Sequence, residues 1–348
     1  MTDNYKIIDR LREGGEASDK ELRRLIEECD EECLAYACRA ARMVRDATLG
    51  RRVRLRGLVE VWSRCEGGCL YCGLRAENVG LGRYEMTSDE IVETCAEGYR
   101  VGLRTFVLQG GQVRDRAEQV AEVVRRLKQS FPDVTVTLSL GEQSREVYAL
   151  WREAGAGRYL LRHETASEQH YRMLHPERMD FHHRRECLGW LGELGYRVGA
   201  GMMVGSPWQS CDDLVADLRY LCELRPHMVG VGPFMPQRST PLGCEARGSV
   251  ERTLLMVALV RLMLPEAMVP ATTALASAAV DGTLRGLDAG ANVVMPNITP
   301  MRYRHQYAIY DHKKSSGEEA LEGVKGLEAA LRNAGYEVVY ESEEYEQK

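Results

Sequence analysis

The sequence lacks the features of membrane and secreted proteins. Its 348 residues contain no apolar run of about 18 residues, the length that a helix needs to cross a bilayer. The first residues do not form a charged segment followed by an apolar stretch, as secretory leaders do. Basic residues are not in excess, with 46 Lys and Arg against 52 Asp and Glu. We therefore expect a cytoplasmic protein that binds neither membranes nor nucleic acids.

Histidine is also scarce, and none of the eight lies before His163. The chain has eleven cysteines, which fits a reducing compartment where thiols stay available for metal. Three of them, Cys65, Cys69 and Cys72, lie in a Gly-rich segment directly after an apolar run. Structural zinc needs four Cys or His ligands, and no His or fourth Cys is near. Iron-sulfur cubanes are normally held by four cysteines, so three predict a 4Fe-4S cluster with one iron left for an outside ligand. Zinc binding and buried core thiols are the alternatives.

The rest of the chain alternates short apolar runs with amphipathic segments. This pattern predicts an α/β protein, a (β/α)8 TIM-type barrel. Its parts would be an N-terminal helical extension over 1–50, the barrel over 51–310, and a C-terminal helix and strand-like tail over 311–348. The expected strands are Leu55–Ser63, Thr105–Gly111, Val134–Gly141, Arg158–Thr165, Arg197–Gly205, Met228–Pro236, Val269–Leu275 and Ala291–Pro296.

The fourth expected strand carries unusual charges for a barrel. Its period of two places Arg158, Leu160, Arg162 and Glu164 on one face. If this face points inward, two guanidinium groups lie where apolar layers normally fill the interior. Arg158 could form an internal ion pair, for instance with Glu60, but a cavity for an anionic ligand accounts better for Arg162.

Several motifs together resemble one family. They are the cysteine triplet with Tyr71, Leu138–Glu142, Arg158–Ala166, Gly199–Gly205, Pro270–Thr273 and Ala289–Asn297. This combination is similar to the HydE family of radical SAM maturases of FeFe-hydrogenase, over about residues 20–310. The resemblance implies a 4Fe-4S cluster whose fourth site binds S-adenosylmethionine (SAM). It also implies an internal cavity in which a 5′-deoxyadenosyl radical attacks the sulfur of a cysteine-bound iron-carbonyl-cyanide complex. HydG would supply this small anionic complex, and HydF would receive the iron product.

The same resemblance implies roles for individual residues. Glu164 and Arg184 would hold the ribose and carboxylate of SAM, with Gln109 and Gln112 near its amine. Tyr71 and Met203 would also line the SAM site. The substrate would be held by the residues Arg158, Arg162, Thr137, Thr272 and Thr273, with Tyr303 at the edge of the cavity.

The chain departs from the family pattern at one position, and two alternative functions remain. Relatives carry an acid where this chain has Gln112, so SAM would lose a charge-assisted contact. A methylornithine synthase-like mutase is the alternative enzyme, but it would need a carboxylate deep in the cavity for an ammonium group. A non-catalytic iron-sulfur carrier is the alternative outside enzymes.

Overall fold

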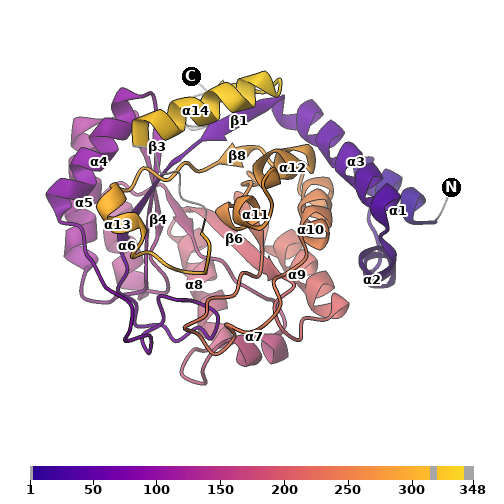
Figure 1. Ribbon diagram of the computed structural model, residues 1–348, viewed down its shortest axis with the longest axis horizontal. Helices are drawn as coiled ribbons and strands as arrows, with labels where there is room; N and C mark the ends of the chain where they lie inside the picture. Colours follow the sequence, from indigo (N-terminus) through magenta and orange to yellow (C-terminus); the bar gives the residue numbers. More distant parts are fainter. Residues whose placement is uncertain (1–2, 314–319, 341–348) are drawn as a thin grey trace.

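The computed structural model describes residues 3–313 and 320–340, and it shows parallel strands inside a ring of helices (Figure 1). The strands are β1 (Arg52–Leu55), β2 (Gly57–Trp62), β3 (Thr105–Gly110), β4 (Thr135–Ser139), β5 (Arg158–Leu160), β6 (Arg197–Val204), β7 (Met228–Pro233), β8 (Val293–Val294) and β9 (Glu337–Val339).

Pairing of these strands closes a barrel. Strands β2 to β7 form one parallel sheet in chain order, and β8 pairs with β1. Isolated parallel pairings complete the ring, namely Met228 with Met268, Pro270 with Val293, and Leu58 with Asn297. The predicted barrel is confirmed, although short pairings rather than long strands hold its closing side.

The expected strands are shorter in the structure, and the eighth keeps only Val293–Val294 as β8. The fourth and the seventh depart further. The fourth ends as β5 at Leu160, and four residues later Glu164 lies in the left-handed region with φ 67° and pairs with Met202 in an isolated bridge. The seventh, expected over Val269–Leu275, gives way to helix α11 (Thr273–Ala278). Thr272 caps this helix by accepting a hydrogen bond from the backbone N–H of Leu275. Pro270, near the start of the expected strand, has no N–H group to donate to a strand ladder.

Helices cover the outside of the barrel and lie between its strands. They are α4 (Ser88–Arg100), α5 (Ala117–Ser130), α6 (Arg145–Glu153), α7 (Glu168–Leu174), α8 (Phe181–Glu193), α9 (Cys211–Leu224), α10 (Val250–Met263), α12 (Gly282–Asp288) and α13 (Met301–Arg304).

The two ends of the chain pack against the barrel. Helices α1 (Asp3–Arg12) and α3 (Glu31–Leu49) pack on α10, and α2 (Asp19–Glu28) packs on α9 and α1 (Figure 1). Helix α14 (Ala320–Asn333) precedes β9, which pairs with β1. The expected C-terminal helix and tail are therefore present. Their predicted outer limits at Glu318 and Ser342 lie outside the described residues. The division of the chain at residues 50 and 310 stays a prediction.

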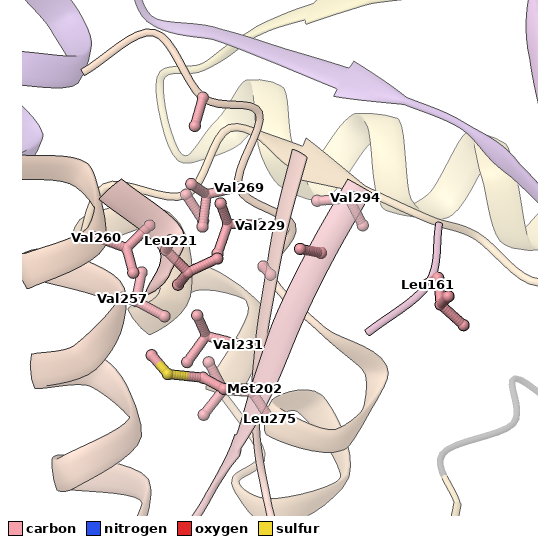
Figure 2. Close-up of a cluster of buried hydrophobic side chains, with 14 of the residues drawn as sticks. Leu161, Met202, Leu221, Val229, Val231, Val257, Val260, Val269, Leu275 and Val294 are labelled. Atoms are coloured by element: carbon pink, nitrogen blue, oxygen red, sulfur yellow. The ribbon is translucent and has the colours of Figure 1, made fainter. Parts of the chain in front are cut away.

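The alternation along β7 separates the core from the barrel interior. Val229 and Val231 point toward Val257 and Val260 of α10, where all four are buried (Figure 2). The alternate positions of the strand, Gly230 and Gly232, face the interior, where a Cβ atom at Gly232 would lie 3.1 Å from the hydroxyl oxygen of Thr272. A Cβ atom at Gly230 would lie 3.9 Å from the Cδ atom of Arg162. Small residues on β7 thus leave room for polar side chains inside the barrel.

Candidate active site

The cysteine triplet lies in the loop that follows β2, at the C-terminal ends of the barrel strands. Barrel enzymes carry their chemistry at this end. The backbone N–H of Gly67 donates to the Sγ atom of Cys65 over 3.3 Å, and the Sγ atom of Cys69 lies 4.0 Å from the Sδ atom of Met179. The Arg83 guanidinium donates to the carbonyls of Leu74 and Arg75, so a positive charge fixes this loop. The sequence analysis missed Arg83 and Met179.

A Gly-rich turn after β3 packs directly on the cysteine loop. A Cβ atom at Gly111 would lie 2.2 Å from the carbonyl oxygen of Arg64, so only glycine permits this approach. The backbone N–H of Glu66 donates to the carbonyl of Gln112 over 2.8 Å and joins the two loops. The side-chain oxygen of Gln112 accepts a hydrogen bond from the backbone N–H of Glu142, at 3.0 Å.

The donor set of the cysteine loop is three free thiols, which fits a cluster held by three cysteines. All three cysteines are free and half-buried. Burial raises the pKa of each thiol, to about 12 for Cys69, and the thiols of Cys65 and Cys69 raise the pKa of Cys72 further. The three groups are therefore close enough to interact. Within residues 3–313 and 320–340, no three Cys, His, Asp or Glu side chains converge on one point as a mononuclear site requires. A cubane would be held by thiolates at a wider spacing, because each thiolate binds a different iron.

An aromatic group covers the cysteine loop from the side of α7. Tyr71 donates from its hydroxyl to the Nε2 atom of His175 over 3.3 Å, and the Nδ1 atom of His175 donates to the carbonyl of Tyr171 over 3.0 Å. The rings of His175 and Tyr171 stack with centroids 3.9 Å apart. Burial, together with the positive charge of Arg184, lowers the pKa of His175 to about 3. The imidazole is therefore neutral and fixes the position of Tyr71. Sequence reasoning did not single out His175.

The alternation predicted for the fourth strand holds. Tyr159 packs among Tyr148, Trp151 and Tyr196 outside the barrel. Leu160 instead packs with Met228, Met268 and Val293. Arg158 is buried and pairs in register with Thr137 of β4. These neighbours place the charged side of the segment toward the interior.

Two ion pairs connect the residues beyond β5. The Nη2 atom of Arg162 lies 3.0 Å from the Oε2 atom of Glu164 and donates to the carbonyl of Met202 over 2.9 Å. The Nε atom of Arg184 lies 2.7 Å from the Oε1 atom of Glu142, and both side chains are buried. Arg184 also donates to the carbonyl of Arg162 over 2.9 Å. Two of the positions expected at SAM, Glu164 and Arg184, therefore form one connected group with Arg162.

The other predicted residues are three threonines expected at the substrate and Met203, expected at SAM. Thr137 is buried, and its hydroxyl has no hydrogen-bond partner among the described residues. The Thr272 hydroxyl donates to the carbonyl of Val231 over 3.3 Å, and Thr273 follows as the first residue of α11. Met203 packs in a small apolar cluster with Tyr71.

Tyr303 does not reach the edge of the barrel interior as expected. It stacks on Tyr84 with centroids 4.7 Å apart, and its hydroxyl donates to Glu90 of the outer helix α4 over 2.7 Å. Tyr307, four residues later, is buried, and its hydroxyl accepts a hydrogen bond from Gln109 over 3.2 Å.

A carboxylate inside the barrel has a lysine partner from far along the chain. Glu60 of β2 is buried and forms an ion pair with Lys313, whereas the sequence analysis considered it as a partner for Arg158. Nothing local in the sequence marks Lys313, so only the fold could reveal this pair.

Comparisons with known proteins agree with this geometry. Residues 59–221 match the Radical SAM superfamily. The HydE subunit of the FeFe-hydrogenase maturase from Thermotoga maritima is 46% identical over 271 residues, which are 78% of this chain and 77% of that protein. The 3-methylornithine synthase of Methanosarcina barkeri is 28% identical, with 95% of both chains covered.

Solved structures share the fold. The crystal structure of methylornithine synthase (PylB) superposes with a TM-score of 0.84 at 28% identity, covering 96% of this chain and 97% of that one. HydG from Carboxydothermus hydrogenoformans gives 0.83 at 19% identity, with 98% and 80% covered, a likeness of fold alone. In the part of the chain that the structure describes, no helix has the length and apolar character of a membrane span.

Proposed function

Because this chain belongs to the HydE family of radical SAM maturases, we propose that it acts on a cysteine-bound iron-carbonyl-cyanide complex during assembly of the FeFe-hydrogenase active site. The family membership rests on the 46% identity with the HydE of Thermotoga maritima. The observation that carries the substrate proposal is the position of Arg162, which lies at the strand ends and reaches toward the open side of β7. HydG as the source and HydF as the acceptor of the iron are part of the same proposal.

Cys65, Cys69 and Cys72 would hold a 4Fe-4S cluster, whose fourth position would bind SAM. When bound, these groups supply a 5′-deoxyadenosyl radical. Tyr71 and Met203 would cover this site as an apolar wall, which excludes water from it. His175 keeps Tyr71 in place through a neutral hydrogen bond.

Glu164 and Arg184 would bind the polar groups of SAM. Glu164 accepts charge-assisted hydrogen bonds and is held in the left-handed backbone region, a strained conformation that often occurs at functional sites. Arg184 is oriented by the Glu142 carboxylate and by the Arg162 carbonyl, which leaves its remaining N–H groups for a ligand carboxylate.

Arg162 would bind the anionic end of the substrate. Its Nη2 atom is paired with Glu164, but its Nε atom has no hydrogen-bond partner among the described residues, which leaves one donor for a ligand oxygen. Thr137 adds a buried hydroxyl without a partner, while Thr272, Thr273 and Arg158 complete the proposed contacts. Tyr303 lies outside these contacts, because its hydroxyl donates to Glu90 of α4.

The proposal is tested by hydrogenase activity in a host that lacks its own HydE and that carries this chain instead. Restored activity is expected with the wild-type chain and not with an empty vector. The same purified, reconstituted chain is incubated with lysine. No complementation together with formation of methylornithine would move the assignment to the mutase. Absence of SAM cleavage under reducing conditions would favour an iron-sulfur carrier.

A further inference from the structure

A buried ion pair inside the barrel links two segments that lie 253 residues apart in the sequence. The Glu60 side chain is 1% exposed and that of Lys313 is 11% exposed. The Nζ atom of Lys313 donates to the Glu60 carboxylate and to the carbonyl of Tyr307, the latter over 3.3 Å. It also lies 4.7 Å from the centroid of the Tyr307 ring, a favourable position for a cation. Oxygen Oε2 of Glu60 has no hydrogen-bond partner among the described residues.

Residues 307–313, here called the strap, carry Lys313 into the barrel. The carbonyl of Ile309 accepts from the backbone N–H of Gly73 in the cysteine loop, at 2.9 Å. The backbone N–H of Asp311 donates to the carbonyl of Pro236 over 3.0 Å. A Cβ atom at Gly73 would lie 1.9 Å from the Ala308 carbonyl oxygen, so the strap is closely packed on the loop. The strap therefore runs across the strand ends, between the cysteine loop and the segment after β7.

Tyr310 of the strap connects Glu60 with the proposed substrate residues. Its hydroxyl is buried inside the molecule. Burial raises the pKa of Tyr310 to about 12, and the phenol interacts electrostatically with both Glu60 and Arg162. The part of the barrel interior beside the strap, here called the chamber, therefore holds two ion pairs. Glu60 pairs with Lys313 on the β2 side, and Arg162 pairs with Glu164 on the β5 side.

The charges of this chamber determine which ligands it can accept. A buried carboxylate attracts any ammonium group that fits, because leaving it unpaired in a low-dielectric interior is costly. Lys313 already supplies that ammonium group from the chain itself. On the β5 side, Arg162 is paired with Glu164, and its Nε atom has no hydrogen-bond partner among the described residues.

We propose that Lys313 is a specificity-determining residue, whose tethered ammonium group fills an ammonium-binding subsite at Glu60 and so excludes substrates with cationic side chains. This inference deepens the proposed function and rests on it, since it explains how a barrel related to methylornithine synthase favours an anionic substrate. Shortening Lys313 removes the tethered ammonium group and opens the subsite to amines.

The test is binding of n-butylammonium to the reconstituted chain, followed by calorimetry and by the melting temperature. Lys313→Ala is expected to bind the amine at least about tenfold more tightly than the wild type, the difference expected for one charge-assisted contact. Butanol has a similar shape but no charge, and it should bind neither to the wild type nor to Lys313→Ala. Lys313→Arg keeps a cation in place and should resemble the wild type.

Glu60→Gln combined with Lys313→Ala locates the subsite. This double variant should lose amine binding, since a neutral amide does not attract an ammonium group as a carboxylate does. Equal amine binding by wild type and Lys313→Ala, or binding retained in the double variant, would overturn the inference. If Lys313→Ala does not fold alone, it should fold when expressed with n-butylammonium. Failure of this rescue would also overturn it. These readouts require no hydrogenase, so they are distinct from failure of the proposed function.

Discussion

The guanidinium group of Arg162 lies 3.0 Å from the carboxylate of Glu164. A residue proposed for the substrate is therefore in direct contact with one proposed for SAM. Arg184 extends this contact by donating to the Arg162 carbonyl. Binding in one half of the site should consequently change the orientation of groups in the other half, because these side chains share partners.

Glu164→Ala should weaken SAM binding by about 1.5–3 kcal/mol, the range for hydrogen bonds that involve charge. The cluster spectrum should stay unchanged, because no cysteine is altered. Equilibrium binding of SAM to the reconstituted chain measures the effect. Glu168→Ala, which removes an exposed carboxylate paired with Arg172, is the matched control. An unchanged dissociation constant in Glu164→Ala would remove this residue from the SAM site.

Gln112→Glu should tighten SAM binding. The amide oxygen of Gln112 already accepts from the backbone N–H of Glu142, and the amide nitrogen cannot accept from an ammonium group. A carboxylate keeps the first contact and adds a charged acceptor. SAM titration of the variant tests this, with Gln119→Glu on α5 as the control. Equal or weaker binding would show that the missing charge is not what limits affinity.

Replacing Cys65, Cys69 or Cys72 by Ala should abolish both the cluster and SAM cleavage. The wild-type chain, reconstituted without oxygen, should carry about one 4Fe-4S cluster. Cys244→Ala is the control, since this cysteine is exposed and lies outside the loop. Iron content, visible absorption and 5′-deoxyadenosine formation are measured together. A triple Ala variant that keeps its iron and its SAM cleavage would refute the cluster assignment.

Arg162→Leu should block hydrogenase maturation and spare uncoupled SAM cleavage. Leucine is apolar and removes all five N–H donors of the guanidinium group, while the cysteine loop is untouched. Complementation and 5′-deoxyadenosine formation are compared with those of Arg172→Leu, a change at an exposed arginine. Full maturation with Arg162→Leu would exclude this residue from substrate binding.

The neutral state of His175 makes stability depend on pH. Its pKa is lowered to about 3 in the folded chain from an ordinary value of 6.5, so the unfolded chain binds the extra proton first. This contribution to stability is fully present above about pH 6.5 and is lost as the pH falls toward 3. Between pH 7 and 5 the free energy of unfolding should decrease by about 2 kcal/mol from this group.

Denaturant unfolding of the reconstituted chain at the two pH values measures this loss. His175→Gln should show a smaller loss than the wild type, because glutamine does not titrate. The other histidines are common to both chains and serve as the internal reference. An equal pH dependence in the two chains would contradict a buried neutral imidazole.

Some relationships in the site could not be read from the sequence. The sequence analysis paired Glu60 with Arg158 as an alternative, but its partner is Lys313, which lies 253 residues away. Tyr303 was expected at the chamber, yet Tyr307 is the residue that contacts Gln109. In each case the sequence contains several residues of the required type, and the path of the folded chain determines which of them makes the contact.

The sequence by itself determined the features that depend on neighbouring residues. The cysteine loop, the barrel alternation and the inward face of the segment from Arg158 to Glu164 all follow from local spacing. Only the tertiary structure decided the early end of β5, the Glu142–Arg184 pair and the Glu60–Lys313 pair. The spacing of residues determines the direction in which a side chain points from one element. The partner of a buried charge depends on which residues from other elements the fold places next to it.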